Sequence, residues 1–226
     1  LNVEFNGQLS LAIQVFKGEY NRKFMLQLIS SQLDMDRMDY LKRDSFYSGV
    51  AEGNVNSERL IQMMNVVDDY LVIEEKGIYS VEKFLMSRRL MYWQAYLHKT
   101  SLVAELILMK ILKRAKELTL KGVQLPCSEP LLFFMQNKVT IDTFDAETLD
   151  LFAQLDDFDI IGALKSWQKQ DDFILSSLSK MIVNRDLLKI KLTSEKVAIE
   201  ELQPLKERFA LENNISLLET NYFIFK

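Results

Sequence analysis

Two carboxylates and a tyrosine share one stripe of a predicted helix near residue 40. Asp36, Tyr40 and Asp44 are spaced four residues apart, so their side chains lie on one helical face. Arg37 flanks this stripe. Carboxylate oxygens bind hard cations, and guanidinium or hydroxyl groups donate hydrogen bonds to phosphate. The segment therefore carries groups that could bind a metal ion and a phosphate.

The same helix also has a simpler interpretation. Asp39 and Arg43 are spaced for an i,i+4 ion pair of the kind found on ordinary exposed helices. From spacing alone, a ligand site and a solvated charged face both remain open.

A second stripe of polar and aromatic side chains lies near residue 90. Arg88, Tyr92 and Tyr96 are again spaced four residues apart. This stripe presents one cation and two phenol groups to the same side of a helix. The alternative for Tyr92, Trp93 and Tyr96 is plain packing in a core.

The string QLDMDRMDYLKRDSFYSGV, residues 32–50, resembles the last conserved block of HD-domain dNTP triphosphohydrolases, D-x-D-[KR]-x-D-Y-x-x-R-D. In that family the second Asp of the block completes a metal site formed by one His and an adjacent His-Asp pair. The resemblance implies that Asp36 is a metal ligand and that Arg37 contacts phosphate. It also implies that Tyr40 packs on the nucleotide sugar and that Asp44 helps to fix it.

A second block agrees with the first. MSRRLMYWQAYLHK, from Met86 to Lys99, is similar to the family's helix in which an Arg reaches the substrate phosphates and a Tyr lies by the sugar and base. These positions correspond to Arg88 and Tyr96. Beyond Gly122 the likeness is loose, and no functional residue is carried over there.

The chain departs from the family at the metal site. His98 is the one histidine of the sequence, and no His-Asp pair occurs. An HD-type site requires imidazole ligands as well as carboxylates. The resemblance implies a divalent metal ion as cofactor, one of Mn, Mg, Fe, Ni or Zn. In related enzymes a His-Lys pair at the place of His98 is associated with an effector site or subunit contact, whereas the simpler interpretation is a helix-surface residue.

Two explanations fit the missing ligands: a fragment that begins after the HD motif, or a degenerate family member. The start at Leu1 and the abrupt end favour the fragment. We expect the full-length protein to be a metal-dependent phosphohydrolase of nucleotides, in particular a dNTP triphosphohydrolase, and these 226 residues to be inactive, with no catalytic residue assigned. The alternative is a non-catalytic module that binds a nucleotide or oligomerises.

The sequence has only 7 Gly and 3 Pro, and such a low content of helix-breaking residues favours long helices. Short helices are expected at 9–17, 24–32, 35–47 and 58–64, and the run YLVIEEKGIYSVE predicts a β-hairpin turning at Glu75, Lys76 and Gly77. Residues 80–120 are expected to form one very long helix or two in tandem, with a break near Thr100 and Ser101. Further helices are expected at 129–137, 145–154, 157–169, 171–185 and 194–213, the last between two strand-like runs.

The predicted fold is therefore mainly α: the remainder of an HD-domain-like helical bundle with a small β-hairpin and a C-terminal β-α-β appendage. Residues 1–122 are expected to be the C-terminal part of an HD-type domain, and residues 123–226 an accessory region.

Composition limits the partners. The net charge of -4 argues against a general nucleic-acid surface, and no apolar run is long enough to span a membrane. The single cysteine, Cys127, excludes an internal disulfide and fits a reducing, cytoplasmic setting. A nucleotide substrate and a homo-oligomer are the expected partners.

Overall fold

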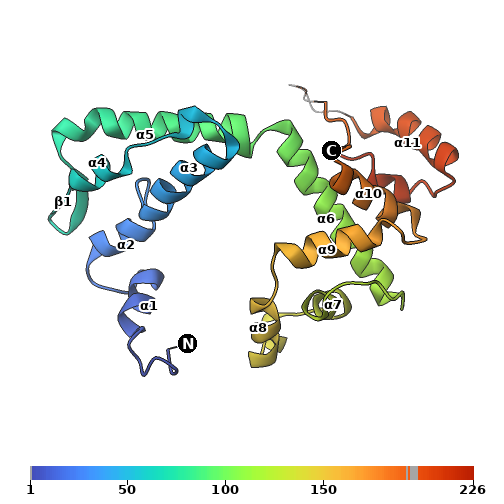
Figure 1. Ribbon diagram of the computed structural model, residues 1–226, viewed down its shortest axis with the longest axis horizontal. Helices are drawn as coiled ribbons and strands as arrows, with labels where there is room; N and C mark the ends of the chain where they lie inside the picture. Colours follow the sequence, from blue (N-terminus) through green and yellow to red (C-terminus); the bar gives the residue numbers. More distant parts are fainter. Residues whose placement is uncertain (1, 192, 194–197) are drawn as a thin grey trace. The chain divides into compact units, whose positions relative to one another are not determined.

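The fold is that of a computed structural model, which describes residues 2–191, 193 and 198–226. The chain forms two compact units, residues 1–98 and residues 99–226. Most of both units is helical, and among the described residues the one sheet is a two-stranded hairpin (Figure 1). The mainly α fold with a small hairpin is confirmed. No described helix is both long and apolar enough to cross a membrane.

The first unit is a set of helices around one hairpin. Its elements are α1 (Ser10–Lys17), α2 (Lys23–Ile29), α3 (Met35–Ser48), η1 (Ala51–Gly53), α4 (Ser57–Gln62), β1 (Met64–Val67), β2 (Tyr70–Ile73), η2 (Glu75–Gly77), α5 (Ile78–Met91) and the π-helical turn η3 (Tyr92–Tyr96). α3 packs against α5, and the short turn η1 lies against both. Their shared core contains Met38, Leu41, Leu60, Phe84 and Met91, all nearly inaccessible to solvent.

Helix α3 begins and ends where its sequence dictates. Asp34 is the N-cap, and its carboxylate accepts a hydrogen bond from the Arg37 amide at 2.8 Å. Gly49 ends the helix in the left-handed conformation, with φ of 74°. Because Met38 and Leu41 are buried, the opposite stripe of α3 is free to carry polar side chains.

The hairpin is present, but the predicted turn was wrong. β1 and β2 pair antiparallel, with Val67 opposite Tyr70. The turn is therefore Asp68 and Asp69, both with positive φ, as a tight two-residue hairpin turn requires. Gly77 instead lies in the turn before α5, where an added Cβ would lie 2.6 Å from the Ile73 side chain.

The long helical stretch divides slightly earlier than expected. α5 passes into the π-helical turn η3, in which the Leu97 amide donates to the Tyr92 carbonyl at 2.7 Å. A new helix, α6 (Lys99–Leu120), then begins. The break predicted near Thr100 thus falls at residues 97–98. The domain boundary predicted after residue 122 stays a prediction.

The second unit has its own core. Its elements are α6, α7 (Glu129–Gln136), η4 (Ile141–Thr143), α8 (Ala146–Ala153), α9 (Asp157–Trp167), α10 (Phe173–Asn184), α11 (Ile199–Asn213) and η5 (Glu219–Tyr222). α10 packs against α6 and α9, and α7 packs against α6 (Figure 1). The fully buried side chains of this core include Ile107, Ile111, Trp167 and Leu175. Cys127 is half-buried beside it, and burial raises the pKa of its thiol.

The strands predicted on either side of α11 were wrong for the described residues. Residues 187–191 are irregular, and the segment after α11 forms the 3-10 turn η5 where a strand was expected. Residues 192 and 194–197 of the predicted strand and helix lie outside the described residues. The aromatic side chains of Tyr222 and Phe223 are buried in the helical core, so the apolar character of this segment reflects packing on helices and not pairing in a sheet.

Candidate functional site

One hydrogen bond joins the two sequence blocks within the first unit. The Tyr96 hydroxyl, from the π-helical turn, donates to Oδ2 of Asp44, from α3, at 2.6 Å. Burial raises the pKa of Tyr96 far above its usual value, and the Asp44 carboxylate raises it further. Tyr96 therefore stays protonated at neutral pH and holds one oxygen of Asp44 in place.

Three tyrosines surround this hydrogen bond. The Tyr40 and Tyr96 rings meet edge to face with centroids 6.2 Å apart, and those of Tyr92 and Tyr96 with centroids 5.2 Å apart. Tyr92 is 37% exposed, and Tyr40 and Tyr96 are half-buried. The rings thus form an aromatic group that is open to solvent on one side and not a closed core.

Two arginines lie near Tyr40. Burial raises the pKa of the Tyr40 phenol, whereas the positive charges of Arg37 and Arg88 act to lower it. The Arg88 guanidinium donates to Oε1 of Gln32 at 2.7 Å and lies 5.8 Å from the centre of the Tyr92 ring. Two cations, three phenols and one carboxylate are therefore gathered from α3, α5 and the turn η3.

Asp34 positions Arg37. Its side chain is buried, and Oδ2 accepts a hydrogen bond from the Arg37 guanidinium at 2.6 Å. Burial alone would raise the pKa of Asp34, but hydrogen bonds from Arg37 and from the Ser31 amide hold it below its usual value. Asp34 is thus an ionised anchor that fixes both the start of α3 and the direction of Arg37.

Asp36 is exposed in the first turn of α3, one helical turn before Tyr40. Its charge acts on the exposed Arg43, which pairs with Asp39. In the part of the chain that the structure describes, no three His, Cys, Asp or Glu side chains are close enough together to hold a metal ion. The residues present therefore do not by themselves fit the metal that the family resemblance implies, and Asp36 as a ligand stays a prediction.

The structure brings together five of the six residues selected from the sequence. Those five are Arg37, Tyr40, Asp44, Arg88 and Tyr96, and their roles in binding stay predictions. Sequence reasoning missed Gln32, which no local signal marks. It also assigned no role to Asp34, although an Asp directly before a helix is a recognisable N-cap signal.

His98 is exposed just after the π-helical turn, and its amide donates to the Ala95 carbonyl at 3.3 Å. An effector role for His98 stays a prediction.

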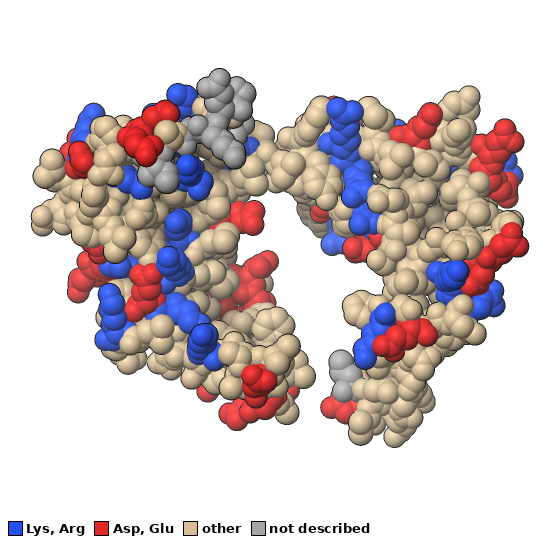
Figure 2. Space-filling view, turned by 180° about the vertical axis from the view of Figure 1, so that it is seen from behind, with Lys and Arg blue, Asp and Glu red and all other residues tan. Residues whose placement is uncertain are grey.

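Acidic and basic side chains are interspersed on the face of each unit that Figure 2 shows. On that face neither unit is uniformly acidic or uniformly basic.

Comparison with known proteins points to HD-domain proteins. A family model described as "HD associated region" matches residues 55–125. The uncharacterized protein YwfO of Bacillus subtilis is 39% identical over 77% of this chain and 39% of its own length. A deoxynucleoside triphosphate triphosphohydrolase SAMHD1 homolog of Dictyostelium discoideum is 30% identical over 34% of this chain and 16% of its own length.

A solved structure extends the likeness to nearly the whole chain. The crystal structure of a phosphohydrolase from Bacteroides thetaiotaomicron is 51% identical, with a TM-score of 0.94, over 98% of this chain and 55% of that one. The chain therefore spans about half the length, or less, of the relatives it matches. Together these findings support an HD-domain phosphohydrolase-like protein.

Proposed function

We propose that this chain supplies the nucleotide-binding side of an HD-type, metal-dependent phosphohydrolase, with a deoxynucleoside triphosphate as the substrate. The observation that carries the proposal is the hydrogen bond from Tyr96 to Asp44, which joins both blocks beside Arg37 and Arg88. The similarity to a Bacteroides phosphohydrolase supports the reaction class. The similarity to the Dictyostelium deoxynucleoside triphosphate triphosphohydrolase homolog supports the substrate class.

The chemistry of each group fits a part of a nucleotide. Arg37 and Arg88 would neutralise phosphate charge, since guanidinium groups donate two hydrogen bonds to phosphate oxygens. Asp44 has a second carboxylate oxygen, which would accept a hydrogen bond from a sugar hydroxyl. The Tyr40 and Tyr96 rings would pack against the apolar face of the sugar.

The proposal assigns no hydrolytic step to this chain. Asp36 is the proposed ligand for a divalent metal, and the further ligands would have to come from outside the described residues, because those hold no cluster suited to a metal. We therefore expect no turnover when these 226 residues are incubated with a panel of dNTPs and Mn²⁺ or Mg²⁺. Release of phosphate, pyrophosphate or triphosphate above a protein-free control would contradict an incomplete site.

Binding without turnover tests the site directly. We propose calorimetric titration of the chain with dGTP in the presence of a chelator. Arg88→Gln should weaken binding by about tenfold or more, because a charge-assisted contact to phosphate is lost.

Arg89→Gln is the matched control. Its guanidinium lies 4.5 Å from the centre of the Trp93 ring, next in sequence to Arg88 but outside the tyrosine group. We expect a change below about twofold, the size of a surface-charge effect. Equal losses for the two variants, or no binding by the unchanged chain, would overturn the proposed site.

One observation favours a second candidate, a regulatory module that binds a nucleotide or oligomerises without catalysis. That observation is the lack of a metal-binding cluster among the described residues. Sedimentation velocity with and without dGTP tests the oligomer. A nucleotide-dependent shift from monomer to oligomer would support the regulatory module, and an unchanged monomer would contradict it.

A further inference from the structure

A polar pocket lies in the second unit, away in sequence from the tyrosine group. It is formed by the second half of α6 and by residues 216–222, and it has a volume of about 410 Å³. Its basic lining residues are Lys110, Lys113, Arg114 and Lys121. Glu117 and Glu219 are its acidic lining residues. Whether a ligand would meet mainly positive or mainly negative groups depends on which of these side chains already pair with one another.

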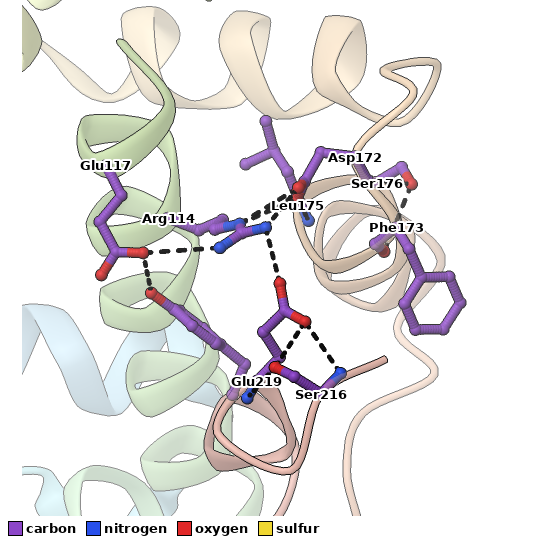
Figure 3. Close-up of polar contacts among 9 residues, drawn as sticks. Arg114, Glu117, Asp172, Phe173, Leu175, Ser176, Ser216 and Glu219 are labelled. Atoms are coloured by element: carbon purple, nitrogen blue, oxygen red, sulfur yellow. Dashed lines mark hydrogen bonds and ion pairs between the residues drawn. The ribbon is translucent and has the colours of Figure 1, made fainter. Parts of the chain in front are cut away.

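Arg114 engages the acidic groups (Figure 3). Its guanidinium donates to Asp172 at 2.6 Å and to Glu219 at 3.2 Å, and it lies 3.6 Å from Glu117. Arg114 is only 11% exposed in its side chain, so the pairing takes place in a partly desolvated setting. This network ties α6 to the N-cap of α10 and to η5, and it directs the Arg114 guanidinium at these carboxylates.

The remaining contacts of these acids are also internal. Glu219 accepts hydrogen bonds from the Ser216 hydroxyl at 2.8 Å and the Ser216 amide at 3.0 Å (Figure 3). Glu117 accepts one from the Tyr222 hydroxyl at 2.6 Å. Both carboxylates are therefore directed at groups of the fold.

Within the described part of the chain, the lysines of the pocket have no carboxylate partner. Among residues 2–191, 193 and 198–226, Lys110, Lys113 and Lys121 form no ion pair with a carboxylate. The Lys110 ammonium lies 4.7 Å from the centre of the Phe225 ring, and that of Lys113 lies 5.9 Å from the centre of the Tyr222 ring. Lys110 and Lys113 thus lie close to aromatic rings.

Like charges are crowded at this place. Burial lowers the pKa of Lys110, and the charges of Lys113 and Lys206 lower it further. Lys206, from α11, donates to the Asn221 side chain at 2.6 Å and so brings a further cation to the same edge. Favourable charge at a helix C-terminus accounts for Lys121 alone, since Lys110 and Lys113 lie well before the last turn of α6.

We propose that this pocket binds a small polyanion, of the class of a chain of two or three phosphates, through Lys110, Lys113 and Lys121. An anion placed beside Lys110 and Lys113 would relieve the repulsion between them and accept several charge-assisted hydrogen bonds. The phosphate chain could be free polyphosphate or the triphosphate of a nucleotide. The site uses none of the residues of the proposed nucleotide site, so either proposal can fail without the other.

The test is calorimetric titration of the 226-residue chain with inorganic tripolyphosphate at low ionic strength. The double variant Lys110→Gln/Lys113→Gln should bind it at least about tenfold more weakly, because two charge-assisted contacts are lost. The double variant Lys165→Gln/Lys169→Gln, on exposed positions of the same unit, removes the same charge elsewhere. It should change binding by less than about twofold.

Two outcomes would overturn the proposal: equal weakening in both double variants, which indicates general charge attraction, or no binding of tripolyphosphate by the unchanged chain. Circular dichroism and thermal unfolding of both variants check that the fold is intact. A competition with dGTP in the Arg88→Gln background then identifies the source. Displacement of tripolyphosphate supports binding of the nucleotide's phosphates in the pocket, and no displacement supports free polyphosphate as the ligand.

Discussion

The Tyr96 hydroxyl connects two segments that are 52 residues apart in sequence, by a single hydrogen bond to a carboxylate. Tyr96→Phe keeps the ring contacts with Tyr40 and Tyr92 and removes this bond alone. A hydrogen bond to a charged group contributes about 1.5 kcal/mol or more, so we expect the free energy of unfolding to fall by about that amount.

Urea denaturation measures the change, with Tyr79→Phe as the control. Tyr79 lies on α5 and is 77% exposed, so its hydroxyl should matter little. If the unfolding free energies of the two variants agree with that of the unchanged chain, the bond to Asp44 does not stabilise the first unit.

Asp34 gives the first unit a stability that depends on pH. The pKa of Asp34 is lowered in the folded chain, chiefly by Arg37 acting against burial. A carboxyl group with a lowered folded pKa stabilises the fold above its unfolded pKa of about 3.9, and that stability is lost as the pH falls through the folded pKa. Asn also caps helices well, so Asp34→Asn removes mainly the charge.

We therefore expect Asp34→Asn to unfold more easily than the unchanged chain at pH 7, by about 1 kcal/mol, and the difference to shrink below about pH 4. Urea titrations from pH 3 to pH 7 measure it. A difference that is constant across this range would show that the Asp34 charge has no part in the stability.

At the scale of elements, Gly53 fixes how closely α3, η1 and α5 approach one another. A Cβ at this position would overlap the Met91 sulfur and lie 2.9 Å from the Ser45 Cβ. Since Met91 is fully buried and cannot move into solvent, Gly53→Ala should destabilise the fold by about 1–3 kcal/mol, as other overpacked cores do.

Gly162→Ala is the matched change in α9, because an added Cβ there has no other atom within 4 Å. Alanine should stabilise that helix by about 0.5–1 kcal/mol. Thermal unfolding measures both changes in stability, which should have opposite signs. Stabilisation by Gly53→Ala would contradict the close approach of η1 to α5.

Helices could be predicted from the sequence far better than strands and turns. Apolar residues at helical spacing and caps such as Asp34 and Gly49 act locally, so most helix bounds agree to within a few residues. The hairpin turn depends on Asp68 and Asp69 accepting positive φ, which a Lys-Gly pair nearby obscured. Tyr222 and Phe223 resemble a strand but are buried by contacts with distant helices.

In the candidate site, too, local features could be predicted from the sequence, and contacts between distant segments could not. The spacing of Tyr40 and Asp44, and of Arg88 and Tyr96, placed each pair on one face of its own segment. Their meeting depends on the packing of α3 against α5 and on the π-helical turn, which moves Tyr96 out of α-helical register. Gln32 lies in a turn before α3, and only the folded chain brings it to Arg88.

At the scale of the whole molecule, each compact unit has its own core and one of the chain's two tryptophans. Trp93, in the first unit, is 60% exposed, and Trp167, in the second, is fully buried. Variants with a single tryptophan, Trp93→Phe or Trp167→Phe, therefore report on one unit at a time. Arg114, which pairs with Asp172 and Glu219, belongs entirely to the second unit.

We expect Arg114→Ala to lower the free energy of unfolding of the second unit, as reported by Trp167, by about 2 kcal/mol. The reason is that two partly buried carboxylates lose their partner. The unfolding followed by Trp93 should stay unchanged, since two cores unfold separately. Arg208→Ala, which breaks an exposed ion pair with Glu212 in the same unit, should cost at most about 0.5 kcal/mol. Equal shifts at both tryptophans in urea would instead mean that the units unfold as one.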